Sequence, residues 1–313
     1  MKQASEYLAF LRSPPEPSPT VQRVGTVTEL LSHVRLSMPI EPIALLLSGG
    51  VDSCSLATFL PRGSACYTVV FPELGQSEAP DAGRYVPEGC RHEIVTVTWA
   101  DYEREHDRLA ASKGYALTGI EPAVLVAMKR AKADGYSTVM TGMGADINFG
   151  DLGRLNAFTN RERLWRAYLK WHVDPVLALR EPHDASAALN QFTRLDGSVD
   201  AREFSLTLAW GDVLAVDNAA RVAGVRHVAP FATRAATNDT AKPGKPLIRA
   251  MHARNTGRPW RLPKRGFRRP MSKWLANYEP TREEFITPLP ALRADQRFYV
   301  YSLERWLGME VSA

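Results

Sequence analysis

Cysteine is scarce in this chain of 313 residues, and the three that occur are Cys54, Cys66 and Cys90. No two of them stand at CxxC spacing, and they form no metal-ligand pattern. This scarcity argues against a disulfide-stapled secreted scaffold and against a cysteine-based metal site. It favours a reducing compartment, so we expect a cytoplasmic location.

Long apolar runs are also missing. No stretch approaches the roughly 20 apolar residues that a membrane-spanning helix needs, and the first residues, MKQASE, lack the apolar core of a signal peptide. Internal repeats and low-complexity tracts are absent as well. With 45% hydrophobic and 23% charged residues, the composition is that of an ordinary globular protein. We therefore expect no membrane segment and a sizeable buried core.

The chain has no strong excess of one charge sign, since its formal net charge is +5. The basic residues concentrate between Arg249 and Arg269. Such a cluster can hold triphosphate and pyrophosphate, or it can form a tRNA-binding face. No pattern of stacking aromatic residues accompanies it, which favours the phosphate interpretation. We expect no nucleic-acid partner.

Apolar segments alternate with amphipathic helical patterns over the first half of the chain. Strands are expected at residues 43–47, 66–71, 93–99 and 137–141. Helices are expected at residues 7–11, 27–36, 53–60, 101–112 and 121–134, with a proline-rich connector at 14–19. This alternation predicts an α/β fold in which helices flank a parallel sheet. From residue 160 onward β-branched runs thin out, which predicts a mainly helical C-terminal lobe.

The most informative segment is Ser48-Gly49-Gly50-Val51-Asp52-Ser53, between the first expected strand and the helix after it. Its glycines let the backbone turn sharply and bring N–H groups close to an anion. The following helix directs its positive dipole end toward the same place. The segment lacks the ending of a Walker loop and the glycine spacing of the dinucleotide fingerprint. It resembles the pyrophosphate loop of enzymes that cleave ATP between the α and β phosphates.

A second glycine-rich segment, Thr141 to Gly150, follows the fourth expected strand. In an open α/β sheet, ligands bind beyond the carboxyl ends of the strands, so this segment is expected to face the first one. Asp146 would then join Asp52 in holding Mg²⁺, a hard ion that prefers carboxylate and phosphate oxygens.

Further segments extend the resemblance to one family. In order along residues 41 to 275, they are Val216-Asp217-Asn218 through Gly224, Pro230-Phe231, Lys245 and Arg249 at Lys-x-x-x-Arg spacing, and Pro263-Lys264-Arg265-Gly266-Phe267 with Pro270. Together with the two loops they resemble the synthetase domain of the asparagine synthetase family, which includes β-lactam synthetases and lasso-peptide cyclases. The resemblance implies a Rossmann-like ATP pyrophosphatase (PP-loop) fold. It also implies activation of a carboxylate as an acyl-adenylate, which an amine attacks to give an amide.

The resemblance further implies how the chain is divided and what it uses. We expect an N-terminal extension at 1–40, an ATP-binding synthetase domain at 41–275 and a helical tail at 276–313. The implied activity is that of an AMP-forming carbon–nitrogen ligase in a biosynthetic pathway, with ATP and Mg²⁺ as cofactors. Its partners would be a small-molecule or peptide carboxylate and an amine donor. A separate ammonia-supplying protein and a homodimer are both left open.

Each motif residue has an expected role. ATP and pyrophosphate would be bound by Ser48, Gly49, Gly50, Val51, Asp52, Ser53, Gly142, Gly144, Lys245, Arg249 and Lys264, and the metal by Asp52 and Asp146. Lys264 would also stabilise the charge that develops during adenylation.

The sequence departs from the family pattern at several positions. Glutamine-dependent members begin with a nucleophilic cysteine in a glutaminase domain, whereas this chain begins Met1-Lys2, so we expect no glutamine hydrolysis by that route. Met143 and Ile147 stand where acids are usual, and Val228 replaces an arginine. Arg226 replaces a glutamate that handles the proton of the amine. We expect Arg226 to face Lys264 across an anion, and His227 to accept the proton instead.

Two alternatives stay open. A sulfur transferase shares the pyrophosphate loop, and Cys54 lies beside that loop, although a cysteine at the apolar start of a helix is more often packed than reactive. A non-catalytic nucleotide-binding partner is the other alternative, favoured by the missing acids.

Overall fold

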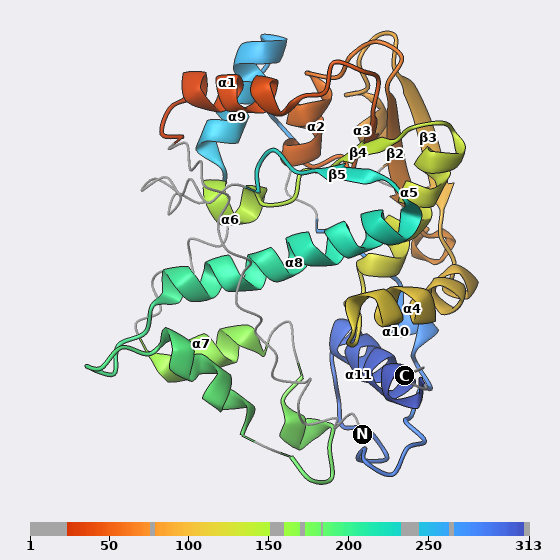
Figure 1. Cartoon of the computed structure of the whole chain (residues 1–313), viewed down its shortest axis with the longest axis vertical. Coiled ribbons are helices and arrows are strands. Elements are labelled where there is room, and N and C mark those ends of the chain that lie inside the picture. Colours follow the sequence, from red (N-terminus) through yellow and green to blue (C-terminus); the bar gives the residue numbers. More distant parts are fainter. Residues whose placement is uncertain are drawn as a thin grey trace.

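The computed structural model describes residues 24–75, 79–150, 160–169, 173–182, 184–232, 244–262 and 266–309 (Figure 1). At residues 147, 167, 185, 202, 205, 206 and 208–210 it describes the backbone alone. The helix expected at 7–11, the proline-rich connector and Lys264 lie outside the described residues. Within them, no helix combines the length and the apolar character needed to cross a bilayer.

A parallel sheet of five strands forms the centre of the fold, in the order β3-β2-β1-β4-β5. The strands are β1 (Ala44–Leu46), β2 (Ala65–Val70), β3 (Arg91–Thr96), β4 (Thr138–Met140) and β5 (Arg226–Val228). The chain first builds β2 and β3 on one side of β1, then β4 and β5 on the other. This reversal lies between β1 and β4, where open α/β sheets bind their ligands. The α/β fold with a parallel sheet is therefore confirmed.

Helices cover both faces of the sheet (Figure 1). One face packs against α1 (Val27–Ser37), α2 (Val51–Ala57) and α9 (Pro246–Thr256); the other packs against α4 (Trp99–Lys113), α5 (Glu121–Ala133) and α8 (Ala201–Ala223). Alternation along the strands explains the division, because Leu45 and Met140 face the first group while Ala44 and Val139 face the second.

The remaining elements are η2 (Pro72–Leu74), α3 (Ala79–Gly83), α6 (Ala145–Phe149), α7 (Arg161–Tyr168), η4 (Pro175–Leu177), η5 (Ala185–Phe192), α10 (Met271–Trp274) and α11 (Ala294–Gly308). In the helical second half, α7, η5 and the start of α8 share a small core of their own, which includes Tyr168, Phe192 and Phe204. By contrast, Phe298 and Trp306 of α11 belong to the main core beneath the sheet.

The sequence prediction missed β5. Its three residues, Arg226-His227-Val228, contain a single β-branched side chain, which is too short a pattern to distinguish a strand from a loop. The strand forms because β4 offers a free edge: Val139 pairs with His227, and the N–H of Thr141 donates to the carbonyl of Val228 at 3.0 Å.

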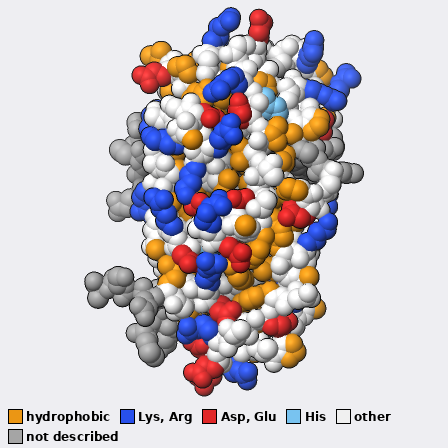
Figure 2. Space-filling model, turned by 90° about the vertical axis from the view of Figure 1, so that its right-hand side faces the viewer, with side chains coloured by type: hydrophobic (Ala, Val, Ile, Leu, Met, Phe, Trp, Pro, Cys, Tyr) orange, Lys and Arg blue, Asp and Glu red, His pale blue; other side chains and the backbone are white. Residues whose placement is uncertain are grey.

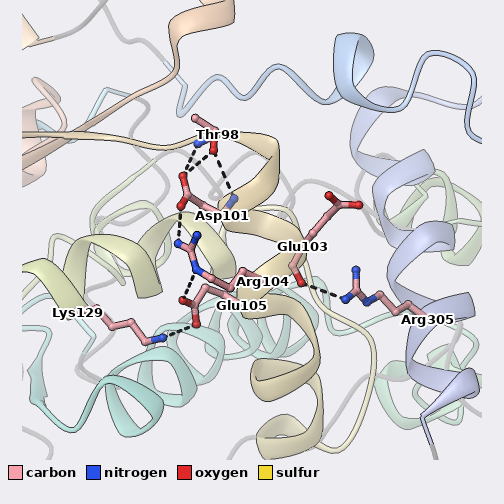
Figure 3. Close-up of polar contacts among 7 residues, drawn as sticks. All are labelled: Thr98, Asp101, Glu103, Arg104, Glu105, Lys129 and Arg305. Atoms are coloured by element: carbon pink, nitrogen blue, oxygen red, sulfur yellow. Dashed lines mark hydrogen bonds and ion pairs between the residues drawn. The ribbon is translucent and has the colours of Figure 1, made fainter.

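A charged network holds α4 against its neighbours (Figure 3). Thr98 and Asp101 form a capping box at the start of α4. Arg104 contacts both Asp101 and Glu105, and Glu105 also accepts from Lys129 of α5. Arg305 of α11 donates to the backbone carbonyl of Glu103 at 3.1 Å. Figure 2 shows side chains of both charge signs interspersed on the face that lies to the right in Figure 1, rather than a patch of one sign.

A buried hydrogen-bonded chain fastens α11 to α4. The Nδ1 of His106 donates to Asp107 at 3.0 Å, because a carboxylate only accepts. Its Nε2 therefore accepts from the hydroxyl of Ser302 at 2.7 Å. The Ser302 oxygen in turn accepts from the N–H of Leu117. The bonding order is that of a serine hydrolase triad, but His106 is 1% exposed and Ser302 fully buried. Substrate has no access to these groups, so their role is structural. Burial lowers the pKa of His106 to about 4.

We predict a pH-dependent loss of stability from His106. The unfolded chain takes up this proton near pH 6.5, whereas the folded protein does so only near pH 4, so lowering the pH through that window favours unfolding. The contribution is on the order of 3 kcal/mol at full loss. Urea unfolding at a series of pH values should show a steep decline between pH 6.5 and 4 that is shallower in His106→Gln. Equal slopes in the two proteins would contradict this assignment.

Candidate active site

The first loop follows β1 directly and is closed by its own serines. Gly49 adopts a left-handed φ of 68°. The N–H of Ser48 donates to Oγ of Ser53 at 3.1 Å, and the two hydroxyl oxygens are 3.2 Å apart. Helix α2 begins at Val51, two residues earlier than expected, so Asp52 belongs to its first turn. Backbone N–H groups of a first turn have no partner within the helix and are available to an anion.

The start of this loop is held from β2. The N–H of Leu47 donates to Tyr67 at 2.8 Å, and the hydroxyl of Thr68 donates to the carbonyl of Leu47 at 2.7 Å. Because the Thr68 proton is used there, the Nε2 of His92 donates to Thr68, at 2.8 Å. Burial lowers the pKa of His92, which keeps the ring neutral. The loop therefore begins from a fixed position.

The second loop lies against the first loop through Gly142 and against the Pro-Phe segment through Gly144, and each contact requires the glycine. A Cβ at Gly142 would lie 2.9 Å from the Cβ of Asp52, closer than real Cβ contacts. A Cβ at Gly144 would lie 2.4 Å from the backbone of Ala232, and Gly144 also has a left-handed φ of 86°. The amide of Asn148 donates to the carbonyl of Phe231 at 2.7 Å, which ties α6 to the Pro-Phe segment.

Lys245 joins the two loops. Its ammonium group contacts Oδ2 of Asp52 and lies 2.8 Å from Oδ1 of Asp146, and the residue is 3% exposed. Lys245 is the non-glycine residue with positive φ, at 56°, in the described part of the chain. An L-residue in this conformation costs roughly 1–2 kcal/mol. Such strain persists where the surroundings impose it, often at functional sites.

This geometry allows a test of the predicted metal site. Asp52 and Asp146 come from different loops, yet both reach one nitrogen cation, so they are placed to share a metal ion. Among the described residues, no group of three or more His, Cys, Asp or Glu side chains could hold a metal. Two carboxylates suit Mg²⁺, which takes its other ligands from phosphate oxygens and water. The residues present therefore fit Mg²⁺ delivered together with a nucleotide.

Arg249 lies one turn after Lys245 in α9. Its Nε donates to the carbonyl of Gly244 at 2.6 Å, which braces the start of the helix that carries Lys245. Lys264 lies outside the described residues. Its described flanks belong to opposite faces of the sheet: Leu262 packs against the cluster of α1, α2 and α9, and Phe267 packs against the main core.

His227 connects α8 to the second loop. Its Nδ1 contacts the carboxylate of Asp217, and its Nε2 lies 2.7 Å from Oγ1 of Thr141, the residue before Gly142. Since a carboxylate only accepts, Nδ1 carries the proton and Nε2 is left to accept from the threonine hydroxyl. The sequence analysis named His227 but not this chain, because the three residues come from a helix, a strand and a loop.

The structure places Arg226 away from the two loops that follow β1 and β4. Lys264, which we expect it to face, lies outside the described residues, so that pairing stays a prediction. Arg226 begins β5 and pairs with Thr138 at the amino end of β4, where its Nε donates to the Thr138 hydroxyl at 3.3 Å. Across the paired strands, Arg226 is level with the residue of the β1 segment that stands five positions before Ser48. Five residues correspond to ~16 Å along the strand direction. The direction of β5 therefore separates Arg226 from the carboxyl edge. Of the other departures, Met143 packs against the main core, which suits its apolar side chain.

The cysteines lack the environment of a sulfur carrier. Cys54 is fully buried among apolar residues. Burial raises the pKa of Cys66 to about 12 and raises that of Cys90 as well. A reactive cysteine needs a lowered pKa, because the thiolate is the nucleophile. These observations disfavour the sulfur-transfer alternative.

Two comparisons with known proteins bear on the family of this chain. The family model described as asparagine synthase matches residues 33–257, which is more than half of the chain. Among curated proteins, the chain is similar to Amidase chry2 from Gibberella zeae, with 27% identity over 171 residues. The alignment covers 46% of this chain and 25% of that protein, so the chain spans about a quarter of the relative's length.

Proposed function

The chain belongs to the asparagine synthase family, a family of ATP-using amide-forming ligases, and we propose that it activates a carboxylate as an acyl-adenylate for attack by ammonia or an amine. One observation carries the proposal: two acidic residues from the two loops beyond β1 and β4 converge on a single cation position. Such a position, next to N–H groups able to hold phosphate, suits a nucleotide bound with a metal ion.

The first loop would bind the β and γ phosphates, which leave as pyrophosphate. The N–H groups of residues 49–53 and the hydroxyls of Ser48 and Ser53 would hold these oxygens. Gly142 and Gly144 would let the second loop approach the nucleotide. Asp52 and Asp146 would hold Mg²⁺, which when bound neutralises phosphate charge.

Positive side chains would stabilise the transition state. Lys245 and Arg249 begin the helix next to the loops, and Lys264 follows it in the chain. As a carboxylate oxygen attacks the α phosphorus, negative charge increases on the phosphate oxygens, and fixed cations stabilise it. Because the Lys245 ammonium lies between Asp52 and Asp146, Mg²⁺ would displace it from that position, and the freed ammonium would contact the β and γ phosphates. We assign Lys264 to the reacting centre.

His227 would accept the proton of the attacking amine through the hydroxyl of Thr141. The Asp217 carboxylate holds the ring with Nε2 free to accept, which is the required tautomer. Arg226 has no part in this step because of its place at the amino end of β5.

The substrates are a small-molecule or peptide carboxylate and an amine donor. Amide chemistry is also in the name of the fungal relative, although the chain matches a quarter of that protein. Supply of ammonia by a separate protein and formation of a homodimer are compatible with this function.

We predict that ATP is converted to AMP and pyrophosphate in the presence of the cognate carboxylate. Asp52→Asn should lower the rate at least a hundredfold, or roughly 2.7 kcal/mol, because it removes a carboxylate from the cation position. Asp196→Asn, in a turn where Asp196 accepts from Ser198, is the matched control and should keep full activity. Chromatographic analysis of the nucleotide products is the measurement. ADP and phosphate as products would overturn the proposal, and a protein that binds ATP without releasing pyrophosphate would be a binding partner instead.

We also predict that His227→Gln separates the two half-reactions. Carboxylate-dependent ATP–pyrophosphate exchange should persist, whereas amide formation should fall roughly a hundredfold through loss of the proton acceptor. Asp217→Asn should act in the same direction, because the His227 ring would no longer be held in the tautomer whose Nε2 accepts a proton. Arg226→Gln is the comparison, and the position of Arg226 leads us to expect no change in either half-reaction. An equal loss of exchange and amide formation in His227→Gln would show that the residue serves the fold or adenylation.

A further inference from the structure

Lys245 reaches the two acids of the cation position from the start of α9. It is the N-cap residue of that helix, while Asp52 stands in the first turn of α2 and Asp146 in the first turn of α6. Helix α9 packs against both α2 and α6, which brings the three helix starts together (Figure 1). The Lys245 side chain is buried, whereas both carboxylates keep surface open to solvent. A dissolved cation could therefore reach the acids, but the ammonium group of Lys245 already lies between them.

The fold places this positive charge against two local preferences. The left-handed φ of 56° at Lys245 disfavours any residue that has a Cβ. As the N-cap, Lys245 also puts a cation at the positive end of the α9 dipole, where an anion is favoured. A glycine at this position would avoid both costs. The contacts with Asp52 and Asp146 offset them, so these contacts hold the lysine in place.

Free Mg²⁺ competes poorly for the same position. To bind there, the metal has to leave the buried ammonium group without a counter-charge, and an uncompensated buried charge is strongly unfavourable. No third acidic or histidine ligand joins Asp52 and Asp146 among the described residues to strengthen a metal site. Mg²⁺ is usually held by one or two carboxylates together with substrate phosphates. Phosphates change the balance, because they give the displaced ammonium group a new anionic partner.

We propose that Lys245 is the resident cation of the Asp52–Asp146 pair and closes it to free divalent metal, so that Mg²⁺ enters only together with a nucleotide. This inference rests on the proposed function, since it concerns how the same site is loaded. By linkage, metal and nucleotide then each raise the affinity of the protein for the other. Lys245 also keeps the two loops in contact before either of them binds.

Metal binding without nucleotide tests the proposal directly. Mn²⁺ is the probe, because the electron paramagnetic resonance signal of the free ion is lost when it binds. The wild type should bind no Mn²⁺ that Asp52→Asn does not also bind. In thermal unfolding, MgCl₂ alone should leave the Tm of the wild type unchanged. MgCl₂ with α,β-methylene ATP should raise it by roughly 2 °C at a tenfold excess over the Kd.

Lys245→Met removes the charge and keeps the length of the side chain. This variant should bind Mn²⁺ about tenfold or more tightly than the wild type, and MgCl₂ alone should raise its Tm. Adding Asp52→Asn should remove the new binding. Lys129→Met is the matched control, because it takes an ammonium group from another carboxylate, that of Glu105, and should leave metal binding unchanged. If Lys245→Met does not fold, Lys245→Gly takes its place, since glycine adopts a left-handed φ without steric cost.

Two results would overturn the proposal. One is Mn²⁺ binding by the wild type that depends on Asp52 in the absence of nucleotide. The other is equal Mn²⁺ binding by the wild type and Lys245→Met.

The same measurements separate this inference from the proposed function. Carboxylate-dependent ATP–pyrophosphate exchange, together with Asp52-dependent Mn²⁺ binding by the nucleotide-free wild type, would remove the role of Lys245 and leave the ligase assignment intact. The expected Mn²⁺ and Tm results in a protein that shows no exchange with any carboxylate would remove the ligase assignment. They would leave Lys245 as the residue that couples metal to nucleotide binding.

Discussion

The contact of one ammonium group, that of Lys245, with Asp52 and Asp146 is the constraint around which the candidate site is organised. Asp52 and Lys245 are 193 positions apart in the sequence. The Lys245 side chain is buried, whereas the side chains of Asp52 and Asp146 are 22% and 47% exposed. Two carboxylates brought to one position repel each other unless a cation lies between them. The left-handed backbone of Lys245 and the absence of a side chain at Gly142 are local costs that this convergence requires.

The sheet makes the convergence possible. Because β1 and β4 are adjacent and parallel, the loops that follow them leave the same edge at the point where the strand order reverses. The same register places Thr141 within reach of His227, and α8 presents Asp217 to that histidine. The nucleotide and the proton acceptor could therefore be served by neighbouring parts of one edge.

Much of this arrangement could be predicted from the sequence. The first four strands, both loops and the Lys245 helix follow from apolar runs, glycines and motif order, which are local signals. The fifth strand could not, since three residues are too few to show a periodic pattern. Without that strand, the place of Arg226 at the amino end of the sheet could not be predicted either. The contacts of His227 with Asp217 and Thr141 could not be predicted either, because the three residues come from a strand, a helix and a loop.

The central claim is that Asp52 and Asp146 act on one shared cation, and a double-mutant cycle tests it most directly. The measurement is calorimetric binding of magnesium with α,β-methylene ATP, which resists cleavage, to the wild type, Asp52→Asn, Asp146→Asn and the double variant. The account predicts that each single change weakens binding by about tenfold or more, and that the double change weakens it far less than the product of the two. Fully additive losses would mean that the two carboxylates act independently, and unchanged binding would mean that no nucleotide-bound metal uses this position.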